Sequence, residues 1–295
     1  MINSRLSGTG VALVTPLHKD GSLDLASLGQ LIHFNIQQGI NYLVSLGTTG
    51  ETAVLSKEEK KEVWKHTVQV VGGRVPLLIG LGGNDTAALC RELEHLDLDG
   101  FDAVLSVSPY YNRPSQEGLY QHYCLLEKAS PLPLMIYNVP ARTGMNISAA
   151  TTLRLAEASP KFIGIKEASG NFAQIMEIIR LRRKDFLVVS GDDNLTLPLM
   201  AAGCDGLISV AANCFPGPVS AMVKNALEGR YREARDLHYR LLHAMDLLFS
   251  EGSPAGVKAA LSIKNICGST VRLPNVEASA GLLSALEAEM AAKEL

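Results

Sequence analysis

The sequence predicts an α/β fold, a (β/α)8 TIM barrel with an appended C-terminal helical layer. Short apolar runs rich in Val, Ile and Leu alternate with amphipathic helical patterns from the N-terminus to beyond position 220. Strict alternation of strands and helices implies a parallel sheet with helical crossovers. Eight such units fit into about 220 residues, and this number favours a closed barrel over an open doubly wound sheet.

The eight predicted strands share the features of buried parallel strands. Each is a nearly continuous apolar run of five to seven residues, bounded by turn-forming residues. Strands of a parallel sheet are covered on both faces, so their hydrophobic pattern does not alternate strictly with polar residues. The predicted strands are 11–15, 42–46, 75–81, 103–108, 134–139, 162–166, 186–190 and 206–210.

Helical patterns occupy the segments between these strands. Residues 25–38, 86–96 and 171–182 carry apolar residues at helical spacing. Another helix is predicted to begin after Ser56, because Ser56 and Glu59 have the spacing of a capping box.

The C-terminal part of the chain departs from the alternating pattern. Residues 230–295 contain three further helical patterns, with Pro254 and Pro274 near the breaks. We therefore expect a barrel catalytic domain over residues 1–229 and a helical extension over 230–295.

Composition and charge restrict the classes of function. The chain has 295 residues, 47% of them hydrophobic, a net charge of −3 and a pI near 6.2, and we expect no nucleic-acid partner. The five cysteines form no CxxC pair, which is typical of reduced, buried thiols. No apolar run reaches the roughly 18 residues of a membrane span, and no N-terminal targeting pattern is visible. These observations predict a cytoplasmic protein without a membrane span.

Lys166 is the most informative residue. It is a lone lysine that ends the apolar run 162–165, and strict alternation would place it on one face with Phe162 and Gly164. Burial disfavours the charged form of an amine and so makes it available for attack on a carbonyl. From the strand alone, Lys166 is either a structural ion-pair partner or a nucleophile that forms a Schiff base.

Other candidate residues follow from the fold, because catalytic groups of such barrels lie at the C-terminal ends of the strands. Tyr137 ends the strand before that of Lys166, so its phenol is placed to transfer protons near the amine. Arg142 on the following loop offers a planar fork for a carboxylate, or is an ordinary surface arginine. Thr48 and Thr49, between two glycines, suit the binding of a small carboxylate, although an ordinary turn has the same pattern.

Metal and phosphate chemistry are not predicted. Asp192 and Asp193 follow a strand, but none of the seven histidines lies at a strand end, as a zinc-dependent aldolase would require. The run Gly80-x-Gly82-Gly83 has neither the Rossmann nor the Walker spacing and is interpreted as a turn. We expect no metal site and no cofactor.

Five motifs in order along the chain resemble the dihydrodipicolinate synthase family of class I aldolases, in a superfamily that includes N-acetylneuraminate lyase. The resemblance extends from about Gly8 to Pro274. The motifs are Gly47-Thr48-Thr49-Gly50-Glu51, Pro109-Tyr110-Tyr111-Asn112-Arg113-Pro114-Ser115-Gln116-Glu117-Gly118, Tyr137-Asn138-Val139-Pro140-x-Arg142-Thr143-Gly144, Gly164-Ile165-Lys166-Glu167-Ala168 and Ser190-Gly191-Asp192-Asp193.

The resemblance implies a reaction and residue roles. It implies condensation of pyruvate with L-aspartate 4-semialdehyde, in lysine and diaminopimelate biosynthesis, by a homotetramer built as a dimer of tight dimers. Lys166 would form the Schiff base with pyruvate, and Tyr137, Thr48 and Tyr111 would relay protons, with Tyr111 supplied by the neighbouring subunit. Thr49 would hold the pyruvate carboxylate.

Three further positions match the family's substrate-binding residues. The resemblance implies that Arg142 receives the carboxylate of the semialdehyde and that Gly191 and Ile208 line the pyruvate end of the pocket. The alternative within the superfamily is an aldolase of the N-acetylneuraminate lyase or 2-keto-3-deoxy sugar acid type, and Arg142 favours the synthase over it. A non-catalytic barrel that binds a 2-oxo acid is a second, less favoured alternative.

Regulation by L-lysine is expected to be weak or absent. Ala88 stands where lysine-sensitive relatives carry a glutamate, and Lys57 and Lys60 stand where they carry histidines. The positions that match the family's inhibitor site are Thr52, Ala53, Lys57, Lys60, Asn84, Ala88 and Tyr110.

Overall fold

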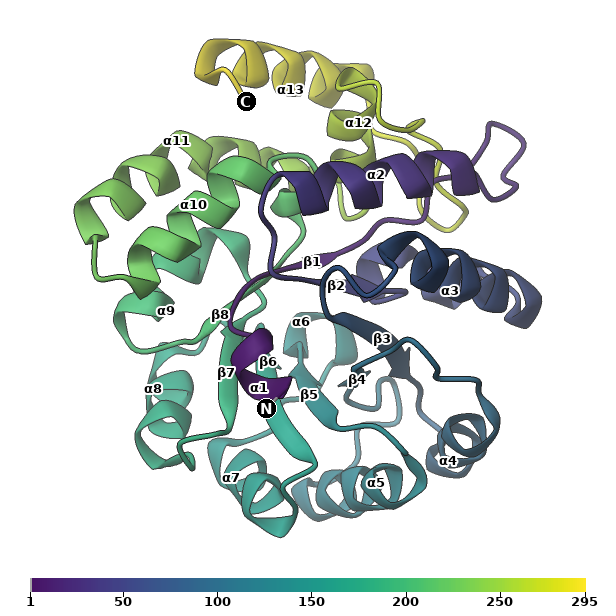
Figure 1. Ribbon diagram of the computed structural model, residues 1–295, viewed down its shortest axis with the longest axis vertical. Coiled ribbons are helices and arrows are strands. Elements are labelled where there is room, and N and C mark those ends of the chain that lie inside the picture. The colour runs from purple at the N-terminus through teal and green to yellow at the C-terminus, as the bar shows by residue number, and fades with distance from the viewer. Residues whose placement is uncertain (1) are drawn as a thin grey trace.

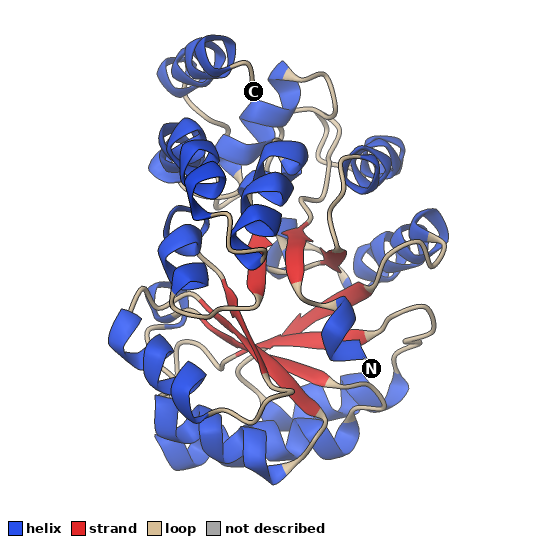
Figure 2. Cartoon of the chain, turned by 60° about the vertical axis from the view of Figure 1, so that its left-hand side comes forward, coloured by secondary structure: helices blue, strands red, loops and turns tan. Residues whose placement is uncertain are grey.

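Eight parallel strands close into a barrel in chain order, and the last strand pairs with the first. The structure, a computed structural model, describes residues 2–295. Helices surround the strands in both views (Figures 1 and 2). The predicted (β/α)8 barrel is confirmed.

All eight predicted strands are present, most within a residue or two of the expected bounds. The first begins three residues earlier than predicted, because two glycines belong to it. A Cβ atom on Gly10 would lie 2.2 Å from the Tyr42 ring, so this strand position needs a residue without a side chain. The strands are β1 (Gly8–Ala12), β2 (Tyr42–Ser45), β3 (Leu77–Gly82), β4 (Ala103–Val107), β5 (Leu134–Asn138), β6 (Phe162–Glu167), β7 (Leu187–Ser190) and β8 (Gly206–Ser209).

The predicted capping box opens a helix as expected. The Ser56 hydroxyl accepts a hydrogen bond from the Glu59 backbone N–H, and the Glu59 carboxylate accepts one from the Ser56 backbone N–H. The helices of the barrel are α1 (Ile2–Arg5), α2 (Leu25–Gln37), α3 (Lys57–Val71), α4 (Thr86–His95), α5 (Gln116–Ala129), α6 (Pro140–Thr143), α7 (Ala149–Ala158), α8 (Phe172–Leu181), α9 (Thr196–Ala201) and α10 (Pro216–Leu227), with short 3-10 turns η1 (Thr48–Gly50), η2 (Thr52–Val54), η3 (Asp193–Leu195) and η4 (Ala211–Asn213).

The three helical patterns predicted after the barrel are also present. They form α11 (Tyr231–Ser250), α12 (Ala255–Ile263) and α13 (Ala280–Lys293), and Pro254 directly precedes α12. These helices pack on one another and α11 packs on α10, at one side of the barrel (Figure 1). The division at residues 229 and 230 stays a prediction.

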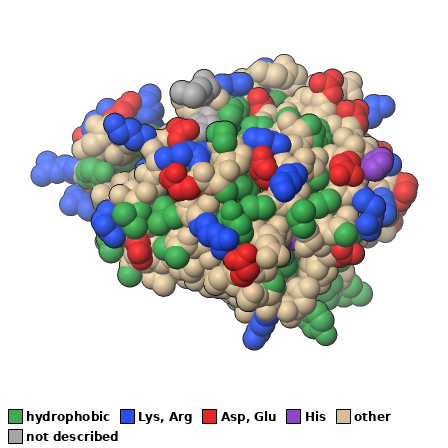
Figure 3. All heavy atoms as spheres, turned by 90° about the horizontal axis from the view of Figure 1, so that it is seen from below, with side chains coloured by type: hydrophobic (Ala, Val, Ile, Leu, Met, Phe, Trp, Pro, Cys, Tyr) green, Lys and Arg blue, Asp and Glu red, His purple; other side chains and the backbone are tan. Residues whose placement is uncertain are grey.

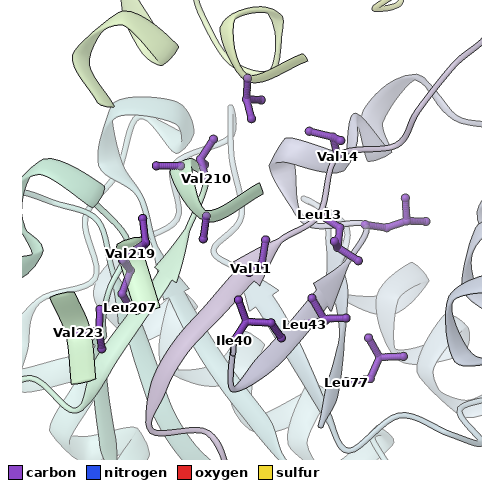
Figure 4. Close-up of a cluster of buried hydrophobic side chains, with 14 of the residues drawn as sticks. Val11, Leu13, Val14, Ile40, Leu43, Leu77, Leu207, Val210, Val219 and Val223 are labelled. Carbon is purple, nitrogen blue, oxygen red and sulfur yellow. The ribbon is translucent and has the colours of Figure 1, made fainter. Parts of the chain in front are cut away.

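Two hydrophobic cores hold the barrel together. The outer core lies between strands and helices, where Leu207 of β8 is close to Val219 and Val223 of α10 (Figure 4). The inner core fills the barrel, and Leu6 belongs to it; α1 lies in front of the strands in Figure 1.

The predicted placement of Phe162 on the face of Lys166 is wrong. Phe162 belongs to the outer core, while Ile163 belongs to the inner core. The pairing of β5 with β6 contains a bulge, since Leu134 pairs with Phe162 but the next residue pairs with Gly164. One extra residue in β6 reverses the side on which the following residues lie.

The surface is mixed in character. On the face drawn in Figure 3, basic and acidic side chains alternate with apolar ones. Among residues 2–295, none of the helices combines the length and apolar character that crossing a membrane requires.

Candidate active site

Lys166 and Tyr137 meet at the C-terminal end of the barrel. They are register partners on β6 and β5, and the Lys166 Nζ atom lies 4.3 Å from the centre of the Tyr137 ring. Both are buried, with 4% and 7% of their surfaces exposed. No ion pair among residues 2–295 includes Lys166. No carboxylate of the described residues lies within ion-pair distance of the Lys166 amine, which acts on Asp192 and Asp193 only through longer-range electrostatics.

Gly191 borders this pair. A Cβ atom on Gly191 would lie 3.0 Å from Lys166 Cε and 2.6 Å from Ala168 Cβ, so the missing side chain leaves room for the lysine stem. Ile208 is fully buried in the same inner core as Tyr137. The structure thus brings Lys166, Tyr137 and Gly191 together, and Ile208 belongs to the inner core that includes Tyr137.

The turn after β2 carries Thr48 and Thr49 in η1. Thr49 is buried and Thr48 is exposed. The interpretation of Gly80 and Gly82 as a turn is wrong, because both lie in β3. A Cβ atom on Gly80 would lie 2.4 Å from the Leu46 carbonyl oxygen, so this glycine allows the backbone that leads into the turn to pass close to β3.

Tyr111 lies apart from the other candidates in the single chain. It is 89% exposed, and its φ of +71° is unusual for an aromatic residue. Arg113 on the same loop also has a positive φ, of +43°. The loop contacts its neighbours through Asn112, whose side chain donates a hydrogen bond to the Asn84 carbonyl oxygen.

Arg142 lies on the short helix α6 and is exposed. No ion pair within residues 2–295 includes its guanidinium. Its loop is held in place from below, because the Asn138 side chain accepts a hydrogen bond from Ile147 N at 3.0 Å and donates one to Glu167 at 3.0 Å. The Arg142 loop is thus anchored by hydrogen bonds that do not involve the guanidinium.

Two buried carboxylates near the site, Glu167 and Asp193, hold the backbone of neighbouring segments. The sequence did not predict this structural role for either of them. Glu167 accepts hydrogen bonds from Asn138, Gln174 and the Ser169 backbone, and burial raises its pKa. Its position directly after Lys166 on an apolar strand is the signal that could have identified it. Asp193 binds the Ser209 hydroxyl and the Val210 and Ala211 backbone N–H groups.

Asp193 therefore fixes the end of β8 beside Ile208. Burial raises the pKa of its carboxyl, while the three donors act in the opposite direction. No group of three or more His, Cys, Asp or Glu side chains in residues 2–295 is arranged to hold a metal ion. All five cysteines are free thiols.

Comparison with known proteins gives one consistent result. Residues 5–293 match the model of the dihydrodipicolinate synthetase family. A 4-hydroxy-tetrahydrodipicolinate synthase from Cytophaga hutchinsonii is 47% identical over 280 residues, which cover 95% of this chain and 94% of the relative.

Solved structures agree with this match. A chloride-inhibited dihydrodipicolinate synthase from Acinetobacter baumannii in complex with pyruvate superposes with a TM-score of 0.94 at 38% identity, covering 98% of this chain and 99% of the other. A structure from Cyanidioschyzon merolae with lysine bound has a TM-score of 0.94 at 34% identity, covering 99% of each chain.

Proposed function

The chain belongs to the dihydrodipicolinate synthetase family, and from this premise we propose that it is an enzyme that condenses pyruvate with L-aspartate 4-semialdehyde to 4-hydroxy-tetrahydrodipicolinate. The product is an intermediate of diaminopimelate and lysine biosynthesis. The observation that carries the proposal is the Lys166 amine, buried beside the Tyr137 ring, with no carboxylate of the described residues within ion-pair distance. Both substrates are acids, and Thr49 and Arg142 lie on two separate loops as candidate carboxylate holders.

In the proposed reaction, the Lys166 amine attacks the ketone carbon of pyruvate. The carbinolamine loses water to form an iminium, which loses a methyl proton to become an enamine. The enamine carbon then attacks the aldehyde of the second substrate. The amino group of that substrate displaces Lys166 from the iminium carbon, which closes the ring and releases the free amine.

Several side chains serve these steps in the proposal. Tyr137 transfers protons at the carbinolamine, together with Thr48 and the Tyr111 of a neighbouring subunit. Thr49 holds the pyruvate carboxylate. Gly191 leaves room for the lysine stem, and Ile208 lines the apolar side of the pocket.

The alternative aldolases of the N-acetylneuraminate lyase or 2-keto-3-deoxy sugar acid type are not favoured. The curated relatives carry the synthase name over nearly the whole chain. The second substrate of the alternative aldolases is a polyhydroxylated aldehyde, for which the guanidinium of Arg142 on α6 has no evident use.

Two measurements test the proposed function. Borohydride reduction in the presence of pyruvate should add one pyruvate-derived mass, and the purified protein should turn over aspartate semialdehyde but not N-acetylmannosamine. A protein that forms no adduct is not a Schiff-base enzyme. Turnover of the sugar alone would favour the alternative.

Tyr111 is expected to act in a neighbouring copy of the chain, within a dimer of tight dimers. Its 89% exposure in one chain supports this proposal, because an aromatic side chain held on a loop at positive φ gains little from contact with solvent. Two inactive variants, Tyr111→Phe and Lys166→Ala, should restore activity when mixed, since each supplies what the other lacks. Random pairing should give about a quarter of wild-type activity.

The matched control for this experiment is a mixture of Tyr111→Phe with Tyr137→Phe. Under the proposal, Tyr137 and Lys166 of one site come from one chain and Tyr111 comes from its partner. One site of each mixed dimer is then fully native, and activity should again recover. A mixture of Lys166→Ala with Tyr137→Phe should stay inactive. Recovery in that last mixture, or none in the first two, would contradict a Tyr111 supplied in trans.

Feedback by L-lysine is expected to be weak. Lys57 and Lys60 of α3 and Arg91 of α4 line one pocket with Ala88 and a single carboxylate, that of Glu92. An ammonium ligand there would meet like charges and would lack a carboxylate at position 88, and a charge-assisted hydrogen bond contributes about 1.5–3 kcal/mol. Affinity should therefore be at least about tenfold lower than in relatives with the glutamate.

Initial rates measured against L-lysine concentration check this prediction. Half-inhibition in the submillimolar range would contradict it. Ala88→Glu alone should not restore tight inhibition, because both lysines remain.

A further inference from the structure

A buried ion pair connects the C-terminal helices to the turn that carries Thr48 and Thr49. Glu51 directly follows that turn, and Lys258 lies on α12. The Lys258 Nζ atom is 2.5 Å from Glu51 Oε1, and the two side chains are 0% and 1% exposed. Position 258 is thus attached to the active-site turn across a separation of 207 residues.

Both members of the pair are satisfied by further hydrogen bonds. Lys258 also donates to the Thr270 carbonyl oxygen at 2.7 Å, and the second oxygen of Glu51 accepts from the Arg272 backbone N–H at 3.0 Å. Burial lowers the pKa of Lys258, and the Glu51 carboxylate acts in the opposite direction. The Glu51 carboxylate is therefore bound by groups from α12 and from the segment that follows α12.

The Arg272 side chain adds further contacts to the segment that follows Glu51. Its guanidinium forms an ion pair with Glu59 and donates to the carbonyl oxygens of Val54 at 2.9 Å and Gly21 at 2.8 Å. The hydrogen bond and charge of the Arg272 guanidinium, together with hydrogen bonds from Ser56, lower the pKa of Glu59 to about 2. The segment around Arg272 thus fixes the chain on both sides of η2.

The backbone at Glu51 needs such support. Its φ is +55°, in the left-handed region that residues with a side chain rarely adopt, and the two 3-10 turns η1 and η2 meet there. The hydroxyl of Thr15 donates to the Gly50 carbonyl oxygen at 2.8 Å on the other side of the same junction. The conformation of the turn thus depends on contacts from distant segments.

Stability alone does not account for a fully buried ion pair. Replacing such a pair with apolar residues of similar volume is often neutral or stabilising, because desolvation offsets the attraction. A buried pair does impose a specific geometry on the groups that it joins. Here that geometry is imposed on the residue next to the Thr48–Gly50 turn.

We propose that Lys258 is a positioning residue that acts through Glu51 to hold the turn Thr48–Gly50 in the conformation that binds the pyruvate carboxylate. The C-terminal helical layer is thereby part of the catalytic apparatus. The consequence for pyruvate rests on the proposed function, whereas the effect on the turn does not.

Amide hydrogen exchange measures the turn directly, whether or not the protein is active. In Lys258→Met, peptides that cover residues 46–51 should exchange at least about tenfold faster than in the wild type, while peptides from β5 and β6 keep their rates. Because Lys258→Met leaves the Glu51 carboxylate buried without its partner, the double variant Glu51→Gln/Lys258→Met is measured in parallel. The double variant removes both charges, so it leaves no buried charge without a partner. It is expected to fold even if Lys258→Met does not.

Kinetics measure the consequence for the reaction. In the folded variants, the KM for pyruvate should rise about tenfold and borohydride trapping of pyruvate should slow, since small displacements of binding groups lower rates strongly. The KM for aspartate semialdehyde should stay within about twofold, because the Arg142 loop is anchored separately by Asn138. A general loss of stability would change both constants together.

Lys264→Met is the matched control. Lys264 directly follows α12 and lies 5.4 Å from the centre of the Phe215 ring, and it forms no ion pair with a described residue. It should leave both exchange and KM unchanged. Exchange of residues 46–51 within twofold of the wild type in both Lys258 variants would overturn the inference, as would an equal rise in both KM values. If the wild type fails to condense the two substrates, the proposed function falls and the exchange result still decides the role of Lys258.

Discussion

Lys166→Ala is expected to abolish covalent capture of pyruvate and to lower kcat/KM by on the order of 10⁴-fold or more, as removal of a covalent nucleophile generally does. The reason is geometric. Lys166 is the amine that stands against the Tyr137 ring, beside the gap left by Gly191. A reaction through an enamine has no route without that nitrogen.

Intact mass after borohydride reduction, followed by peptide mapping, measures this result. Lys161→Ala is a suitable control, because Lys161 lies just before β6 and donates hydrogen bonds to the Glu127 and Ser130 carbonyl oxygens. It should still form the adduct. A labelled peptide that lacks Lys166 would show that another amine carries the intermediate.

The barrel was predictable because its signals are local. Eight apolar runs punctuated by helical patterns determine a parallel sheet, and the capping box at Ser56 and Glu59 is contained in four residues. The errors arose where contacts between strands determine the bounds of a strand or the side on which its residues lie. The first strand was predicted to begin at residue 11, yet β1 includes Gly10, where the Tyr42 ring needs the space. The bulge opposite Leu134 is invisible in β6 alone.

The site divides in the same way. Lys166, Tyr137 and Gly191 lie together because the ends of neighbouring strands meet in a barrel, which the fold class already implies. The pairing of Glu51 with Lys258 depends on how the C-terminal helices dock, and no local pattern encodes that. Neither the strand order nor the packing within one chain explains a role for Tyr111, since its side chain is exposed in a single chain.

Arg142→Ala is expected to impair the second half of the reaction while sparing the first. A hydrogen-bonded pair between guanidinium and carboxylate contributes about 1.5–3 kcal/mol, which corresponds to roughly a 10- to 150-fold loss in kcat/KM for aspartate semialdehyde. The pyruvate adduct should form at the wild-type rate, because the proposed role of Arg142 on α6 is to bind the second substrate alone.

Arg142→Lys separates charge from shape in the same experiment. An ammonium keeps the positive charge but lacks the planar fork that binds both carboxylate oxygens, so an intermediate loss is expected. Single-turnover kinetics with each substrate resolve the two halves. Equal losses in both would mean that Arg142 maintains the loop after β5. That outcome conflicts with the hydrogen bonds that hold this loop through Asn138 and Thr143, since none of them uses the Arg142 side chain.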